Sequence, residues 1–279
     1  GSIETLQPKK LQVGATRSLS NNLAGQIAGV IAVQRSGEPG YDSSNFWIRG
    51  IASFSGGQSP LVLVDGIERD LNNIDPAEIE SFSVLKDASA SAMYGVRGAN
   101  GVIVINTKRG KVGAPSVNLR VEHSIAEPTK LPDFIGAADH MALINEITEN
   151  KSRLPFSQEQ IDRTRYGYDR DLYPDVNWQD EILHKTSFQQ TYYVSAQGGG
   201  SIARYFVSMG MSKESAAYIQ DPDSRYKADT GYNTYNYRTN LDINVTKSTT
   251  LYLGLDGFIS NKKEPGMANT DLLWNAQSM

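Results

Sequence analysis

The chain has 279 residues and a formal net charge of -4, from 27 basic and 31 acidic side chains. Because basic and acidic residues are interspersed along the chain, the sequence shows no basic patch of the kind that binds nucleic acid. The hydrophobic fraction is 39% and the mean hydropathy is -0.41, and no run approaches the ~18 apolar residues that a transmembrane helix needs.

Few side chains suggest catalysis or metal binding. Cysteine is absent, which excludes a disulfide framework and a cysteine-ligated metal. His123, His140 and His184 are far apart, and none has a second ligand at helical spacing. No serine lies in a G-x-S-x-G elbow. The sequence therefore predicts no catalytic residue, no metal site and no cofactor, and it argues against an enzyme.

The first part of the chain alternates short apolar segments with small helical ones. Leu19, Leu23 and Ile27 have the spacing of a helix between residues 18 and 29. The continuous apolar run Leu61–Val64 is typical of a strand buried on both faces, and residues 101–107 form a similar run. We therefore expect residues 11–110 to form a compact α/β domain with a small mixed sheet.

Turn signals separate these elements. Asp65-Gly66 predicts a type I′ hairpin turn. Asp75-Pro76-Ala77-Glu78 predicts a capping box that opens one helical turn. Asp87 is the expected cap of the next short helix, and Gly95 is its expected end. The glycines of residues 95–101 follow a helix and precede a strand, the reverse of a phosphate-binding loop, so they are interpreted as turn residues.

After Pro115 the pattern changes to alternation of apolar and polar residues, which predicts strands. In residues 235–246 every charged side chain is even-numbered, so all the charges lie on one face. Long connections at 127–187 and 213–234 alternate with short ones, as in transmembrane barrels. The expected strands lie near residues 117–125, 191–197, 202–212, 235–246 and 251–259.

The chain resembles the plug and first barrel strands of a TonB-dependent outer-membrane transporter of the SusC/RagA type. The plug motifs that carry the resemblance are Gly37-Glu-Pro-Gly40, Ile48-Arg-Gly50, residues 60–66, residues 79–87, Tyr94-Gly95 and residues 97–103. Later matches are Tyr173-Pro174, Trp178 with Ile182-Leu183, Ser195 to Gly199 before Tyr205, and Tyr237 to Leu241. In Val176-Asn-Trp178 the chain departs from the family, which more often has an acidic residue before the tryptophan.

The resemblance implies a fold class and a domain order. The expected fold is an α/β plug followed by antiparallel strands of an incomplete transmembrane β-barrel, which in the whole family has about 22 strands. Residues 1–10 are expected to be an expression scar and leader, residues 11–112 the plug, and residues 113–279 the N-terminal portion of the barrel. Loops 127–187 and 213–234 would be extracellular.

The resemblance also implies a function and partners. Proteins of this kind import oligosaccharides, or in some members peptides, across the outer membrane of Bacteroidetes. A SusD-like surface lipoprotein caps the barrel, and the TonB complex supplies energy. The segment that contacts TonB is expected upstream of Gly1, and outer-membrane lipid would surround the strands.

Two groups of residues are candidate sites. Arg49 and Arg97 are expected either to pair with acidic residues of the barrel wall or to satisfy groups inside the plug. Phe54 and Gln58, in the loop over residues 53–60, suit contacts with a sugar on the substrate path. The full set of plug-motif and ionic-contact candidates is Arg49, Gly50, Asp65, Gly66, Lys86, Asp87, Tyr94, Gly95, Arg97, Gly98, Asn100 and Gly101.

Two other classes remain as alternatives. A soluble, secreted carbohydrate-binding β-sandwich with an α/β appendage is compatible with the 14 tyrosines and the alternating strands. Such a sandwich has turn signals roughly every 8 to 12 residues, and the long connections argue against it. An α/β enzyme lacks a recognisable catalytic constellation.

The alternating faces give a testable expectation. Val207 and Leu253 should face lipid, whereas Arg238 and Asp242 should face the plug. The variants Val207→Arg and Leu253→Arg should each cost ~2–4 kcal/mol if the site lies at mid-bilayer, and Asn240→Arg should cost much less. Equal tolerance on the two faces, measured by unfolding of the protein from lipid, would exclude the transmembrane assignment.

Overall fold

The computed structural model describes residues 3–11, 18–23, 25–34, 36–48, 59–86, 88–129, 131, 133–148, 154–219, 223, 230–264 and 271. The chain divides into two compact units. The first comprises residues 1–126, 188–216 and 231–262, and the second comprises 127–187, 217–230 and 263–279. Arg49, Gly50, Phe54, Gln58 and Asp87 lie outside the described residues.

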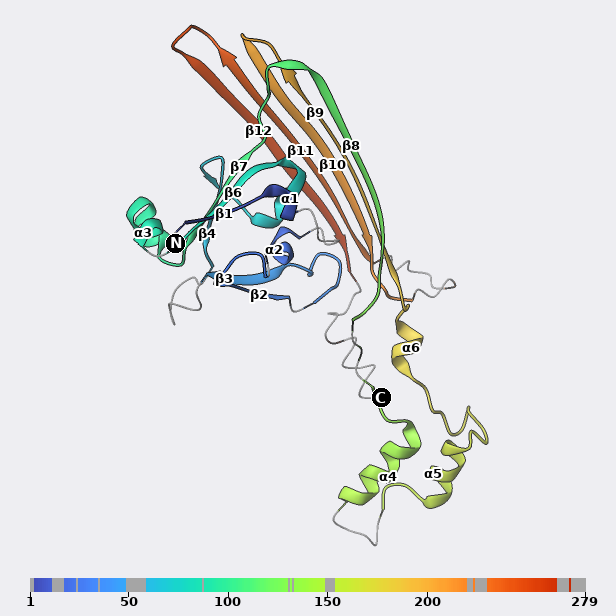
Figure 1. Ribbon diagram of the computed structural model, residues 1–279. Helices are drawn as coiled ribbons and strands as arrows, with labels where there is room; N and C mark the ends of the chain where they lie inside the picture. Colours follow the sequence, from blue (N-terminus) through green and yellow to red (C-terminus); the bar gives the residue numbers. More distant parts are fainter. Residues whose placement is uncertain are drawn as a thin grey trace. The chain divides into compact units, whose positions relative to one another are not determined.

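A mixed five-stranded sheet forms the centre of the N-terminal part (Figure 1). Its order is β1-β6-β7-β4-β5, with β4 parallel to β7 and the other pairs antiparallel. The prediction of a mixed sheet with Leu61–Val64 (β4) as a core strand is confirmed, because all four residues are buried. The other strands are β1 Ile3–Leu6, β5 Ile67–Glu68, β6 Ile79–Leu85 and β7 Val102–Thr107.

Short helices and a two-stranded sheet accompany this central sheet. The helices are α1 Pro8–Leu11, α2 Leu19–Asn22, α3 Ala88–Tyr94, and the 3-10 turns η1 Leu71–Asn73, η2 Pro76–Glu78 and η3 Gly95–Gly98. The small sheet pairs β2 Val30–Gln34 with β3 Ser44–Ile48. We refer to β1 to β7 and these helices as the plug.

The predicted helix over residues 18–29 is shorter than expected. It ends at Asn22, and Gly25 has a positive φ of 73° that a right-handed helix does not allow. Leu19, Leu23 and Ile27 are nevertheless all buried in the main core, which also contains Phe82. The spacing therefore predicted which side chains are buried, but not the length of the helix.

Two of the predicted turns are confirmed. Asp65 and Gly66 have φ values of 49° and 84°, and they join β4 to β5 in register, as a type I′ hairpin requires. Gly95, with φ 60°, ends α3.

The predicted capping box at Asp75 is half right. The Asp75 carboxylate accepts a hydrogen bond from the Ala77 amide at 2.7 Å and caps η2. Glu78 does not complete the box; its carboxylate instead bonds side chains of two later strands.

The assignment of the first ten residues to a leader was wrong for β1. Ile3–Leu6 pairs antiparallel with β6, with Ile3 opposite Leu85 and Leu6 opposite Phe82. The segment is only four residues long, too short for its alternation to be distinguished from a tail by sequence alone.

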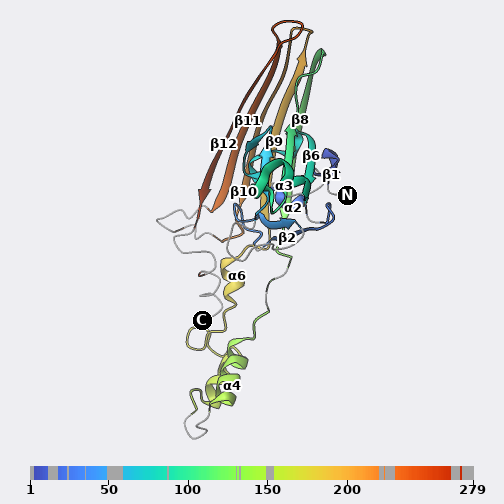
Figure 2. The same ribbon diagram turned by 90° about the vertical axis from the view of Figure 1, so that its left-hand side faces the viewer.

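Five long antiparallel strands follow the plug (Figures 1 and 2). They lie in the order β12-β11-β10-β9-β8, so each neighbour in sequence is a neighbour in the sheet. This meander against the plug differs from the two packed sheets of a β-sandwich. The strands are longer than the alternating segments that predicted them: β8 Gly113–Ala126, β9 Ser187–Gly199, β10 Ala203–Ser215, β11 Gly231–Asn244 and β12 Thr250–Lys263.

The second unit contains three helices, α4 Ala137–Ile147, α5 Gln158–Arg165 and α6 Trp178–Ile182. The periodicity that predicted α4 is confirmed. α5 was missed because only Ile161 and Thr164 are buried, although Ser157 and Gln160 form a complete capping box. Among the residues described, none of the helices is both long and apolar enough to cross a membrane.

Candidate functional site

The plug-facing side of β10 and β11 carries the polar side chains. Even-numbered residues point toward the plug: Arg238 is 6% exposed and Asp242 is 4% exposed. Odd-numbered residues point away, with Val207 41% exposed. The prediction that Arg238 and Asp242 face the plug is confirmed. Because neighbouring residues of a strand point to opposite faces, one sheet presents a polar surface to the plug and an apolar surface away from it.

A buried carboxylate anchors the plug to this polar surface. Glu78, at the end of η2, is 2% exposed. Its Oε1 accepts hydrogen bonds from Ser208 Oγ at 2.7 Å and Asn236 Nδ2 at 3.1 Å, and its Oε2 accepts one from Arg238 Nε at 2.9 Å. We call these four residues the Glu78 cluster. A buried carboxylate is tolerable only with such pairing, since desolvating an unpaired charge costs several kcal/mol.

The local sequence leaves room for this cluster. Gly210 lies opposite Asn236 in the β10–β11 register. A Cβ at position 210 would come within 2.3 Å of the Asn236 side-chain oxygen. Glycine at this position therefore allows the Asn236 amide to lie flat across β10 and reach Glu78.

A second chain of hydrogen bonds runs beside the cluster. Asp65, in the type I′ turn, accepts bonds from the Thr107 amide at 2.9 Å and the Thr107 hydroxyl at 2.6 Å. Asn240 on β11 donates to Thr107 Oγ1 at 2.8 Å and to the Lys108 carbonyl at 2.7 Å. Arg238 Nη1 lies 3.7 Å from Asp65 Oδ2 and links the two groups. The end of β7 is thereby fixed against β11.

Ion pairs extend the contact to other strands. Arg109 Nη1 lies 2.5 Å from Asp242 Oδ1, and Arg120 Nη2 on β8 lies 2.8 Å from Asp75 Oδ2. Arg69 Nη2 lies 3.1 Å from Asp256 Oδ1 on β12. The last pair is more exposed, and pairs of that kind contribute only about 0–1 kcal/mol each. The buried Glu78 cluster therefore dominates the attachment.

The environment of Asp75 perturbs its ionisation. Burial raises the pKa of the Asp75 carboxyl, while the neighbouring Arg120 guanidinium and the Ala77 amide act in the opposite direction. A carboxyl whose pKa is higher in the folded state than in the unfolded state stabilises the fold while that carboxyl is protonated. Its contribution is fully present below the unfolded pKa and is lost as the pH rises through the folded pKa.

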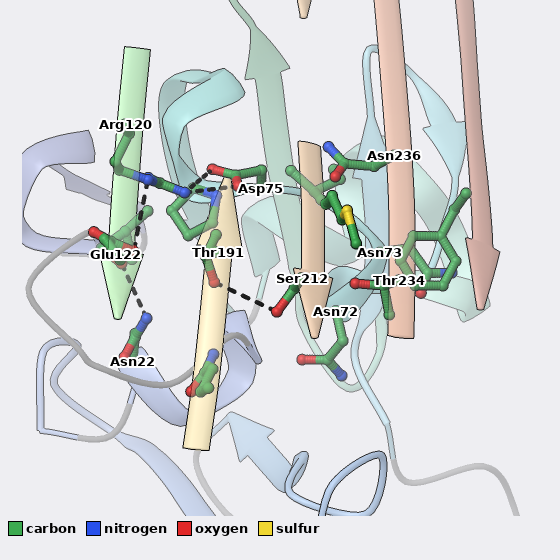
Figure 3. A pocket seen from close by; sticks show the side chains of 16 residues that line it. Asn22, Asn72, Asn73, Asp75, Arg120, Glu122, Thr191, Ser212, Thr234 and Asn236 are labelled. Carbon is green, nitrogen blue, oxygen red and sulfur yellow. Dashed lines mark hydrogen bonds and ion pairs between the residues drawn. The ribbon is translucent and has the colours of Figure 1, made fainter. Parts of the chain in front are cut away.

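A polar crevice opens between the plug and the strands (Figure 3). The plug contributes η1, η2 and the α1 and α2 ends, and the strands contribute side chains from β8 to β12. On the strand side of the crevice, Thr191 Oγ1 and Ser212 Oγ are hydrogen-bonded at 3.4 Å between the neighbouring strands β9 and β10. The lining residues are Leu11, Asn22, Asn72, Asn73, Ile74, Asp75, Pro76, Arg120, Glu122, Gln189, Thr191, Met211, Ser212, Thr234, Asn236 and Phe258.

The predicted plug cations that the structure describes have partners within the plug. Lys86 is 4% exposed, and its Nζ donates to Glu4 Oε2 at 2.7 Å and to the Ala28 carbonyl at 2.5 Å. Its hydrogen bond lowers the pKa of the Glu4 carboxyl. Arg97 pairs with Glu68 near the β4–β5 hairpin.

The remaining described motif residues shape turns. Gly98 is buried, and a Cβ there would lie 2.5 Å from the Ala90 carbonyl oxygen. Gly101 has φ 89°, and a Cβ there would lie 2.7 Å from Ile48 Cδ1. Tyr94 packs against the smaller of the two plug cores, and Asn100 lies in the turn before β7. These residues hold the plug together. Glu78 and Asn240 were not predicted as interface residues, and Arg238 was predicted to face the plug without a named partner.

The expected tolerance of Asn240→Arg was wrong. Asn240 is 3% exposed and makes two hydrogen bonds to the plug, so an arginine there has no space and removes both bonds. Ser248, in the exposed turn between β11 and β12, is the better control for Val207→Arg. Within the described residues, no group of three or more metal-ligating side chains comes together.

Comparison with known proteins agrees with this architecture. Residues 1–102 match the family model of the TonB-dependent receptor plug domain. The chain is 30% identical over 256 residues to TonB-dependent receptor SusC of Bacteroides thetaiotaomicron, covering 88% of the chain and 24% of SusC. It is also 30% identical over 255 residues to TonB-dependent receptor P26 of Formosa agariphila, again covering 24% of that protein. The chain thus spans about a quarter of the length of these curated relatives.

Solved structures show the same fold. The RagAB peptide transporter superposes with a TM-score of 0.77 at 23% identity, over 95% of this chain and 31% of that one. The siderophore receptor PirA of Acinetobacter baumannii superposes with a TM-score of 0.54 at 16% identity, over 92% of this chain and 31% of that one.

The chain therefore contains the plug domain of a TonB-dependent receptor, followed by antiparallel strands that form an open sheet. Its sequence similarity to SusC and its structural similarity to RagAB agree with the SusC/RagA type. The predicted family and fold class are confirmed. The relatives named above are receptors rather than enzymes.

The Glu78 cluster gives a stability prediction. Glu78→Ala should lower the free energy of unfolding by ~3–5 kcal/mol, because it leaves Arg238 buried without a counter-charge. Replacing both residues by methionine should recover much of this loss. Arg69→Ala, in the exposed pair with Asp256, should cost less than about 1 kcal/mol. Equilibrium unfolding of the detergent-solubilised protein measures all three, and equal losses for Glu78→Ala and Arg69→Ala would contradict the dominance of the cluster.

Asp75 gives a prediction about pH. As the pH rises from about 4, the usual pKa of aspartate, the folded state holds the Asp75 proton longer than the unfolded state does, so wild-type stability should fall. Asp75→Asn keeps an oxygen that accepts the Ala77 amide but removes the titration. The wild-type minus variant difference in melting temperature should therefore decrease with rising pH. If the difference in melting temperature between wild type and Asp75→Asn is constant across this pH range, burial does not raise the pKa of Asp75.

Proposed function

We propose that this chain forms the plug and adjoining barrel wall of an energy-dependent importer in the bacterial outer membrane, with the plug as its gate. The observation that carries the proposal is the two-faced sheet, polar toward the plug and apolar on the other side. Met209, Leu255 and Ile259 are 64%, 62% and 63% exposed on the apolar side. A sheet side that exposes large apolar side chains suits contact with lipid.

The chemistry of the plug attachment supports a gating role. The contacts between the plug and the strands described above are hydrogen bonds and ion pairs, including the Glu78 cluster and the Thr107–Asn240 bond. A typical intramolecular hydrogen bond contributes only about 0.5–1.5 kcal/mol net, because water can replace the partner. A plug held in this way can leave the wall without exposing a large apolar surface, provided that water enters behind it.

The relatives support a proposal about the substrate class. The chain is 30% identical to TonB-dependent receptor SusC over 256 residues, and the RagAB structures are of a peptide importer. We therefore propose oligosaccharides, or alternatively peptides, as the cargo, with a SusD-like lipoprotein over the outer opening and the TonB complex as energy source. The long connections near residues 127–187 and 216–230 would face outward, and the short turns near 200–202 and 245–249 would face the periplasm.

The plug-motif residues have specific structural roles in the proposed gate. Asp65 and Gly66 form the turn that holds Thr107, and Lys86 holds β1 through Glu4. Gly95, Gly98 and Gly101 shape the connection between α3 and β7. Arg49, Gly50 and Asp87 remain predicted plug contacts. Pairing of Arg49 and Arg97 with acidic residues of the barrel wall also remains a prediction. Tyr94 and Asn100 complete this set.

Uptake of labelled substrate by cells tests the proposal. Deletion of the whole gene should abolish uptake of either an oligosaccharide or a peptide, and re-expression should restore it. Phe54→Ala and Gln58→Ala should each reduce uptake, because the loop over residues 53–60 is proposed to line the substrate path. Val96→Ala, at a plug side chain that is 93% exposed, serves as control. Unchanged uptake in Phe54→Ala would remove that loop from the path, and unchanged uptake in the deletion strain would refute import.

A further inference from the structure

We infer that a second attachment, near the first residues of β11 and the last residues of β12, holds the plug and must open before the plug can move. It consists of Gly40 and Tyr41 from the connection between β2 and β3, Tyr232 from β11 and Lys262 from β12. We call these four residues the Tyr41 clamp. The inference deepens the proposed function and rests on it, because it names residues that hold the gate closed at this end.

A tight turn of the plug lies against the side chains of the two strands (Figure 1). The Tyr41 amide donates to the Glu38 carbonyl at 2.9 Å and closes the turn. Gly40 has φ 77°, and a Cβ there would lie 3.0 Å from Lys262 Cε and 3.1 Å from Tyr232 Cδ2. Glycine is therefore favoured for two reasons, the left-handed backbone and the close approach of these side chains.

The charged contact of the clamp is a cation–π interaction. Lys262 Nζ lies 2.8 Å from the centroid of the Tyr41 ring, so the ammonium meets the negative face of the aromatic ring. Tyr41 is 49% exposed, whereas Glu78 of the other attachment is 2% exposed. Because cation–π attraction is weak at exposed sites, the clamp can open while the Glu78 cluster stays closed.

The clamp and the Glu78 cluster hold the plug at two separate levels of the same strands. Tyr232 lies six residues before Arg238 on β11, and Lys262 lies six residues after Asp256 on β12. Six residues of a strand span about 20 Å. A body fixed at two points this far apart cannot pivot about either one. Opening the clamp therefore frees the plug to rotate about the Glu78 cluster.

Hydrogen bonds tie the turn to the body of the plug. The Asp42 carbonyl accepts from Asn21 Nδ2 at 2.7 Å, and the Ser44 amide donates to Ser20 Oγ at 3.0 Å. The Ser20 amide in turn donates to Asn72 Oδ1 at 3.1 Å in η1, the element that precedes η2. The clamp thus holds the part of the plug that carries the Glu78 cluster.

Distances between two spin labels on the whole purified transporter test the clamp, with any native cysteine removed. Ser43→Cys labels the plug beside the turn, and Asn261→Cys labels β12; both positions are exposed. We expect one narrow distance with the clamp intact. Lys262→Met removes the charge and should raise the ratio of open to closed plug about two- to five-fold, seen as a longer distance. Lys262→Arg should restore the narrow distance, because a guanidinium also binds the face of a ring.

Two controls show whether the effect belongs to the clamp. Lys263→Met, on the opposite face of β12, should leave the first distance unchanged. A second label pair, Glu80→Cys with Ser248→Cys, reports on the plug beyond the clamp and should keep its distance in every variant. The inference is overturned if Lys262→Met leaves the first distance unchanged or if Lys263→Met changes it equally. It is also overturned if the second distance is lost, which would show that the plug detaches or unfolds as one body.

A reversible crosslink tests whether the clamp must open during uptake. Tyr41→Cys and Lys262→Cys are joined in cells by a short bifunctional maleimide whose linker contains a disulfide. We expect uptake of labelled oligosaccharide or peptide to stop, and to return when a reductant cleaves the linker. Lys213→Cys with Asn233→Cys, register partners on β10 and β11, gives a crosslink within the strands that should leave uptake unchanged. Equal uptake before and after the first crosslink would overturn the inference.

Failure of this inference and failure of the proposed function are distinguishable. If deletion of the gene abolishes uptake and the crosslinked plug still imports, the proposed function stands and the clamp does not. If deletion leaves uptake unchanged, import is refuted, and the label distances on purified protein still decide whether the clamp holds the plug.

Discussion

The position of the plug depends on one buried carboxylate. Glu78 ends a 3-10 turn whose start is fixed by Asp75, and it reaches three donors on two neighbouring strands. An ionised carboxylate at 2% exposure requires those donors, and Arg238 at 6% exposure requires that carboxylate. Each group therefore makes the other tolerable, and neither the turn nor the strands can shift far without leaving a charge unpaired.

The same constraint explains why the strands are polar on one side. A plug held by apolar packing would need a large apolar surface on the inner wall, which would be exposed to water whenever the plug moved. Hydrogen bonds of the Asp65–Thr107–Asn240 kind can be exchanged for bonds to water at a small net cost. The polar inner face is thus compatible with a mobile plug, while the apolar outer face is independent of it.

The interface is not uniform along the strands. Near Arg238 and Asn240 it is closed, because the polar groups named there bond directly across the interface. Near Thr191 and Ser212 it opens into the crevice, where Arg120 keeps an unused donor. Asn236 belongs to both regions, since it lines the crevice and also donates to Glu78. A change in the crevice therefore has a direct physical route to the anchor of the plug.

Sequence alone determined those features that depend on neighbouring residues. The type I′ turn at Asp65-Gly66 and the end of α3 at Gly95 follow from backbone conformations that few residues adopt. The buried strand β4 and the two faces of β11 follow from apolar patterning, and the family resemblance rested on the plug motifs. The sequence predicted helices less well. The helix α2 ends before Gly25, whose positive φ a right-handed helix does not allow, and α5 was missed because few of its side chains are buried.

The tertiary structure decided the role of side chains whose partners are distant in sequence. Glu78 has the right type and position for a capping box, and only the approach of β10 and β11, some 130 and 160 residues later, makes it an anchor. Asn240 has an even, polar position that predicted tolerance to arginine, yet its contact with Thr107 leaves no space there. The edge strand β1 is defined by its pairing with β6. Periodicity shows which face a residue occupies, but the partner on that face is fixed only when the chain folds.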